Sequence, residues 1–115
     1  MKIIITDYFE KNLKKVVKDL KIEDIISKIN IESKNFIDLN SPYFKVKINS
    51  KNKTYRLLLS YDKENIIILF IKIFDKKDKI IWENINWEMH KEKIIEWRNK
   101  NIEDVEKWKY RKIFI

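Results

Sequence analysis

The residues of this sequence best suited to chemistry are basic and lie in one stretch. Between Tyr43 and Tyr61 the chain has no acidic residue, and its five basic residues there are Lys45, Lys47, Lys51, Lys53 and Arg56. Preorganised lysine and arginine side chains stabilise the charge that a phosphodiester gains in its transition state. Crowded ammonium groups also lower one another's pKa, so that a lysine can act as a base near neutral pH. Such a stretch could cleave RNA with the substrate's own 2′-hydroxyl as nucleophile.

The composition excludes several other kinds of site. The chain has no glycine, no cysteine and a single histidine, His90. Glycine-rich phosphate loops, the usual zinc sites and thiol catalysis are therefore ruled out, and a Ser-His-Asp triad is disfavoured. We expect neither a metal nor another cofactor.

The placement of charge is better evidence for a polyanionic partner than the net charge of +8. Abundant Ile, Lys and Asn are typical of an AT-rich coding sequence. Such codon usage increases the number of lysines even where they have no function. Such drift would also raise glutamate, so it does not explain an acid-free basic window. The alternative to a functional basic face is a solvent-exposed row of lysines that prevents the strand from pairing with other chains.

No targeting signal is recognised in the sequence. Only three apolar residues separate Lys2 from Thr6, which is too few for a signal peptide, and the longest apolar run, 66–71, is too short to span a membrane. We expect a cytoplasmic protein without a membrane partner.

The elements that position the basic residues follow from the spacing of apolar residues. Residues 2–6 predict a strand, with Thr6 or Asp7 capping a helix over 7–20, and a shorter helix is expected over 23–29. The next segment, 31–43, is ambiguous and contains a loop at Pro42.

An antiparallel meander of three strands is expected next, over 44–48, 54–61 and 66–74. A turn at 62–65 joins the last two, with Asn65 able to take a positive φ. Helices are expected to complete the chain. The sequence therefore predicts a single α+β domain over 1–115, with a small twisted sheet and a helical C-terminal extension over 83–115.

In that extension the first helix should end at Lys100, and Asn101 should cap another. His90 is expected to be exposed. Core positions are predicted for the tryptophans in the helical stripes, which are Trp87, Trp97 and Trp108.

The meander should gather the basic residues on one face. Lys45 and Lys47 lie two residues apart on one strand and Arg56 lies on its hairpin partner, with Lys45 expected near 56–57 and Lys47 near 54–55. Further residues are predicted to bind RNA, namely Lys51, Lys53, Lys72, Lys76, Lys79 and Trp82. Trp82 follows the basic loop and could stack on a base, with core packing as the alternative.

Four motifs in this order resemble the RelE/ParE superfamily of toxins from type II toxin–antitoxin systems, and RelE in particular. They are Phe44-Lys45-Val46-Lys47-Ile48, Thr54-Tyr55-Arg56-Leu57-Leu58, the apolar strand 66–74, and Asp75-Lys76-Lys77-Asp78-Lys79. The resemblance implies a ribosome-dependent mRNA endonuclease, whose products carry a cyclic phosphate and a 5′-hydroxyl. It implies as partners a cognate acidic antitoxin, the ribosome and mRNA.

By position, the resemblance implies that Lys45 and Lys47 include the base, that Arg56 stabilises the phosphate and that Lys77 assists the leaving group or the transition state. Glu83 stands where the family has a stacking tyrosine, and Trp82 lies one residue before it. Lysine at position 77, where the family has arginine, lacks the bidentate geometry of a guanidinium.

Other functions compete with RNA cleavage. A ParE-like member would inhibit DNA gyrase, and a non-catalytic module would only bind RNA or DNA. The charge could also reflect codon drift alone. The sequence leaves open the codon preference, the antitoxin and the oligomeric state.

Overall fold

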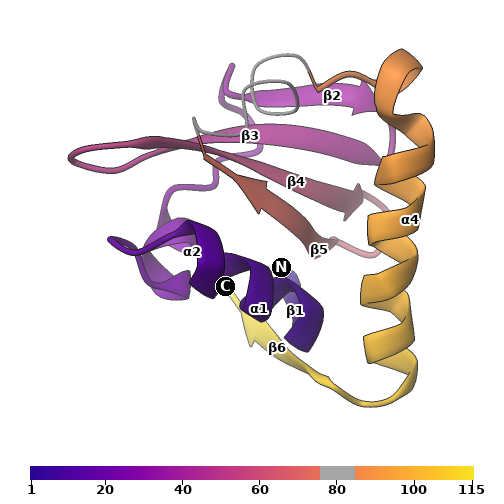
Figure 1. Cartoon of the computed structure of the whole chain (residues 1–115). Helices are drawn as coiled ribbons and strands as arrows, with labels where there is room; N and C mark the ends of the chain where they lie inside the picture. Colours follow the sequence, from indigo (N-terminus) through magenta and orange to yellow (C-terminus); the bar gives the residue numbers. More distant parts are fainter. Residues whose placement is uncertain (76–84) are drawn as a thin grey trace.

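The computed structural model describes residues 1–75 and 85–115. The chain forms a six-stranded mixed sheet in the order β2-β3-β4-β5-β1-β6, so the predicted α+β class is confirmed (Figure 1). In chain order the described elements are β1 (Lys2–Thr6), α1 (Asp7–Val16), α2 (Ile22–Ser27), β2 (Phe36–Asn40), β3 (Tyr43–Asn49), β4 (Thr54–Asp62), β5 (Ile67–Phe74), α4 (Trp87–Glu106) and β6 (Tyr110–Phe114).

The N-terminal strand and helix form where the sequence predicts them. The Thr6 hydroxyl caps α1 by accepting a hydrogen bond of 3.1 Å from the Phe9 amide. The helix ends at Val16, before the predicted end at residue 20, because Val17 adopts an extended backbone. Two consecutive β-branched valines lose side-chain freedom in a helix, which favours this early end.

The meander contains four antiparallel strands rather than the predicted three. The additional strand, β2, comes from the segment that was ambiguous in the sequence and pairs with β3. It lies at the edge of the sheet and exposes Ile37 and Asp38, so its residues lack the clear alternation of a half-buried strand. The positive φ after β4 falls on Ile66 rather than Asn65.

The C-terminal part contains one long helix, so the prediction of a second helix capped by Asn101 is wrong. The buried residues of α4 are His90, Ile94, Trp97 and Asn101. Their three- and four-residue spacing places them on one stripe that faces the sheet. This stripe explains why His90 is buried rather than exposed and why Asn101 is an interior residue. The strand β6 follows α4 and pairs with β1.

Each face of the sheet is covered by different helices. Side chains of α1 and α2 pack on one face, in a core that contains Phe9, Ile25 and Phe70. On the opposite face, the core joins Ile94 and Trp97 of α4 to the strands. The two termini meet beside β1 and β6, where the Met1 amino group donates to the Ile115 carbonyl at 2.8 Å (Figure 1).

The three predicted core tryptophans have different environments. Trp97 is buried and Trp87 is half-buried, whereas Trp108 is 81% exposed, so its predicted core position is wrong. Trp108 lies beyond the end of α4 at a positive φ, and it therefore no longer follows the helical stripe. Within residues 1–75 and 85–115, no helix is long and apolar enough to cross a membrane.

Candidate nucleic-acid interface

The strand register brings the predicted basic residues onto one face of the sheet. Lys47 lies directly opposite Arg56, and Lys45 lies opposite Leu58. The predicted pairing was therefore displaced by one or two residues. Residues directly opposite each other project from the same face, so both lysines share a face with Arg56. This face is the one that α4 covers in part, because Leu58 belongs to the same core as Trp97.

A β-bulge adds Lys72 to this face. Leu58 pairs with Lys72, and Leu59 pairs with Phe70, so Ile71 is the extra residue of β5. Before the bulge, Ile68 and Phe70 face the α1 side. Strict alternation would have sent Lys72 into that apolar core. We call Lys45, Lys47, Arg56 and Lys72 the basic face.

Lys45 has the environment expected of a lysine base. Its side chain is half-buried, and its Nζ donates a hydrogen bond of 3.2 Å to the Ile85 carbonyl. Burial lowers the pKa of Lys45, and the nearby positive charge of Arg56 lowers this pKa further. Both effects disfavour the charged ammonium, so they increase the fraction of neutral amine at neutral pH.

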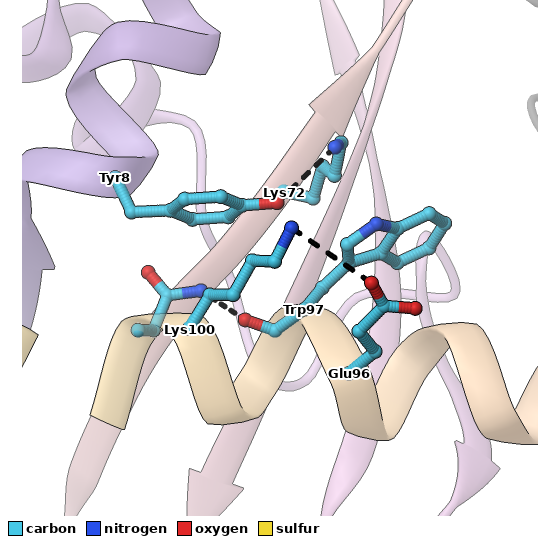
Figure 2. A network of polar contacts seen from close by, with 6 residues as sticks. Tyr8, Lys72, Glu96, Trp97 and Lys100 are labelled. Atoms are coloured by element: carbon cyan, nitrogen blue, oxygen red, sulfur yellow. Dashed lines mark hydrogen bonds and ion pairs between the residues drawn. The ribbon is translucent and has the colours of Figure 1, made fainter. Parts of the chain in front are cut away.

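Two aromatic rings lie beside the Lys72 ammonium group. Its Nζ lies 4.9 Å from the ring centre of Trp97 and 5.6 Å from that of Tyr8, and it approaches the Tyr8 hydroxyl at 3.3 Å (Figure 2). Lys100 lies 5.7 Å from the same tyrosine ring and 3.8 Å from Glu96. These contacts join α1, β5 and α4, so they give Lys72 a role in packing.

The hairpin turn carries Lys51 and Lys53, both of which are exposed. Asp19, from the segment between α1 and α2, lies beside this turn and accepts hydrogen bonds from the Tyr55 hydroxyl at 2.6 Å and the Ser50 hydroxyl. These hydrogen bonds lower the pKa of Asp19. The stretch without acidic residues in the sequence therefore has an acidic neighbour in space, Asp19, beside the turn.

Four predicted site residues, Lys76, Lys77, Lys79 and Trp82, lie outside the described residues, as does Glu83. Among the described aromatic residues, the Trp87 ring stacks on Tyr43 at 5.3 Å between ring centres. The Trp97 ring lies 5.5 Å from that of Phe74. Both tryptophans are therefore packed against the sheet.

Three residues that shape this site were not predicted from the sequence, namely Tyr8, Trp97 as a partner of Lys72, and Asp19. One available signal was the single lysine in an otherwise apolar strand, because a half-buried ammonium needs partners. The residues that supply those partners lie far from Lys72 in the sequence. In the part of the chain that the structure describes, no group of three or more His, Cys, Asp or Glu could hold a metal ion.

A comparison of the chain with protein families, curated proteins and solved structures found no match.

Proposed function

We propose that this protein is the toxin of a toxin–antitoxin pair and that it cleaves mRNA on the ribosome by attack of the RNA 2′-hydroxyl. The observation that carries the proposal is the half-buried Lys45, whose pKa is lowered by burial and by Arg56 on a shared sheet face. Its partners are an acidic antitoxin, the ribosome and mRNA, as the resemblance to RelE implies.

In the proposed reaction, the neutral amine of Lys45 accepts the proton of the 2′-hydroxyl. The 2′-oxygen forms a bond to phosphorus while the bond from phosphorus to the 5′-oxygen breaks. The leaving 5′-oxygen takes a proton from an ammonium group, supplied by Lys47 or Lys77. The Arg56 guanidinium binds the non-bridging oxygens, where negative charge increases in the transition state. The products are a 2′,3′-cyclic phosphate and a 5′-hydroxyl.

The proposal assigns different roles to the lysines of one row. Lys45 and Lys72 flank Leu58 across three strands, but Lys72 is held between the rings of Tyr8 and Trp97. We therefore assign the reaction to Lys45, Lys47 and Arg56, while Lys72 adds positive charge and supports the helices. The exposed Lys51 and Lys53 extend this charge along the hairpin for contacts to RNA phosphates.

The experiment is cleavage of a message on purified ribosomes by the parent protein and by Lys45→Ala, Lys47→Ala and Arg56→Ala. We expect each variant to lose about a hundredfold or more of the cleavage rate, as expected when a catalytic acid, base or charge-stabilising group is removed. Lys11→Ala, which removes an exposed lysine of α1, is the matched control and should keep the parent rate. Circular dichroism verifies that every variant is folded. Parent-like cleavage by all three variants would refute the assignment.

A non-catalytic RNA-binding role is the second candidate. The hydrogen bond that Lys45 donates to the Ile85 carbonyl is available to a charged ammonium as well as to a neutral amine. In this case the ribosome-bound message would stay intact, and RNA binding would weaken steeply with salt. Inhibition of DNA supercoiling with intact mRNA would instead favour a gyrase inhibitor.

A further inference from the structure

The strand β6 ends the sheet and leaves one of its two edges without a neighbouring strand among the described residues. Its five residues pair with β1 in an antiparallel register, from Lys2 opposite Phe114 to Thr6 opposite Tyr110. An edge of this kind presents backbone donors and acceptors to which another strand can pair.

The hydrogen bonds to β1 show which backbone groups of β6 face outward. Met1 and Ile115 exchange hydrogen bonds of 2.8 and 2.9 Å, and the Asp7 amide donates to the Lys109 carbonyl. Hydrogen-bonded and non-hydrogen-bonded pairs alternate along an antiparallel ladder. The N–H and C=O groups of Tyr110, Lys112 and Phe114 therefore point away from β1, off the edge of the sheet.

Large apolar side chains are concentrated around this edge. Trp108 is 81% exposed, Phe114 is 73% exposed and Ile115 is 59% exposed. The Trp108 ring stacks on Tyr110, with ring centres 6.2 Å apart. Exposed apolar groups beside outward-facing backbone groups are a combination that protein partners use, because such partners bury both.

The charge around β6 restricts the partner. Lys109 and Lys112 are exposed, and Lys112 lies 5.9 Å from the ring centre of Tyr110. Arg111 is also exposed but forms an ion pair of 2.8 Å with Glu10, so the charge offered to a partner comes from the two lysines. Pairing β6 with a second copy over its full length would place Lys112 opposite Lys112, and like charges directly opposite are destabilising. RNA phosphates would leave the outward carbonyl groups without donors. An extended protein segment with acidic side chains satisfies both the backbone and the charge.

We propose that β6 is a docking edge for an extended, acidic segment of another protein, which adds to the sheet as a further strand. Strand β1 lies between β6 and β5, the nearest strand of the basic face, so the outer edge of β6 is distinct from the basic face. The inference therefore does not depend on the proposed cleavage of RNA.

The test uses three labelled peptides whose binding is followed by fluorescence anisotropy. The first has four Glu-Val repeats, the second has four Lys-Val repeats, and the third is the Glu-Val peptide with N-methyl groups on every residue after the first, so that neither of its edges can donate backbone hydrogen bonds. We expect the Glu-Val peptide to bind at least about tenfold more tightly than either of the other two, which corresponds to about 1.4 kcal/mol. Equal binding of the Glu-Val and Lys-Val peptides, or undiminished binding of the N-methylated peptide, would overturn the proposal.

Two variants at one position separate the backbone from the side chain. Lys112→Pro removes an N–H that β1 does not use, whereas Lys112→Ala keeps this N–H and removes the charge. We expect Lys112→Pro to weaken binding of the Glu-Val peptide by about tenfold or more and Lys112→Ala to weaken it less. The N-methylated peptide tests the same hydrogen bonds from the partner side, should Lys112→Pro fail to fold.

Two further outcomes would contradict the proposal. A parent dimer in sedimentation that Lys112→Pro converts to a monomer would show that a second copy occupies the edge. Displacement of the Glu-Val peptide by oligouridylate, lost in Trp108→Ala, would show that Trp108 and Tyr110 are a platform for RNA bases. A monomeric parent, with peptide binding that is insensitive to oligouridylate, supports the docking of a protein segment.

Discussion

The strand β3 sends alternate side chains to two different environments. Phe44, Val46 and Ile48 enter the apolar core beneath α1 and α2, where they are at most 5% exposed. On the opposite face, Lys45 and Lys47 stay half-buried near Arg56. The comparison shows that β3 is more completely buried on the α1 side than on the α4 side. The α4 side can therefore retain charged groups that a fully packed face would exclude.

The α4 side itself holds cations in two different ways. Arg56 disfavours the charged form of Lys45, whereas the rings of Tyr8 and Trp97 lie 5.6 Å and 4.9 Å from the Lys72 ammonium. Position in one row of the sheet therefore does not give two lysines the same role. Their different neighbours distinguish a candidate base from a packing residue.

The largest effect on stability should come from the α1 face. Phe70→Ala removes a fully buried ring that contacts Phe9, and we expect it to lower the free energy of unfolding by about 3–5 kcal/mol. Lys47→Ala, on the other face, should change it by less than about 0.5 kcal/mol. Urea unfolding measures the free energy of unfolding of both variants. Similar decreases in the two variants would contradict the difference between the two faces.

A smaller effect is expected where α4 is attached through buried polar groups. The Asn101 side chain accepts a hydrogen bond from the Thr6 hydroxyl and donates to the Ile71 and Trp97 carbonyls. Asn101→Ala leaves buried groups without partners and should cost about 1–3 kcal/mol of unfolding free energy. Asn99→Ala, on the exposed side of the same helix, is the control and should unfold like the parent.

A still smaller effect should distinguish Lys72 from Lys45. Lys72→Met removes the ammonium between two rings and should lower the free energy of unfolding by about 0.5–2 kcal/mol. Cleavage of ribosome-bound mRNA by this variant should stay within a few-fold of the parent rate. A loss of cleavage as large as that of Lys45→Ala, in a variant as stable as the parent, would place Lys72 in the reaction.

The subtlest effect concerns the pH at which cleavage rises. Lys45 must be neutral to accept a proton, so the rate should increase with pH until the lowered pKa of Lys45 is passed. Arg56→Gln removes a charge that disfavours the ammonium, which raises this pKa and moves the rising limb to higher pH. Burial, the larger cause of the lowered pKa, persists in the variant. A pH–rate profile whose rising limb keeps its position in Arg56→Gln would exclude this coupling.

The sequence predicted the elements whose apolar residues repeat regularly. Strands β3, β4 and β5 and helix α1 show clear alternation or helical spacing, and the shared face of Lys45, Lys47 and Arg56 follows from that alternation. Among the described strands, β2 and β6 each pair on one side only, and they carry exposed residues such as Asp38 and Lys112, so their spacing is less regular.

The site required information that spacing cannot contain. The side on which Lys72 lies depends on the bulge at Ile71, which reverses the alternation along β5. Its ring partners, Tyr8 and Trp97, approach only when α1 and α4 pack near the same strand. The burial of Asn101 was not predictable for a similar reason. Asparagine is favoured at helix starts, but α4 continues through Asn101 and buries it.

The chemistry of the cut ends on ribosome-bound mRNA tests the central claim most directly. Two messages are compared, one of which lacks only the 2′-hydroxyl at the nucleotide before the cleavage position. The proposed mechanism predicts a 2′,3′-cyclic phosphate and a 5′-hydroxyl from the first message, and an intact second message. Cleavage of the message that lacks this hydroxyl, or no cleavage of either message by the folded parent protein, would contradict the account.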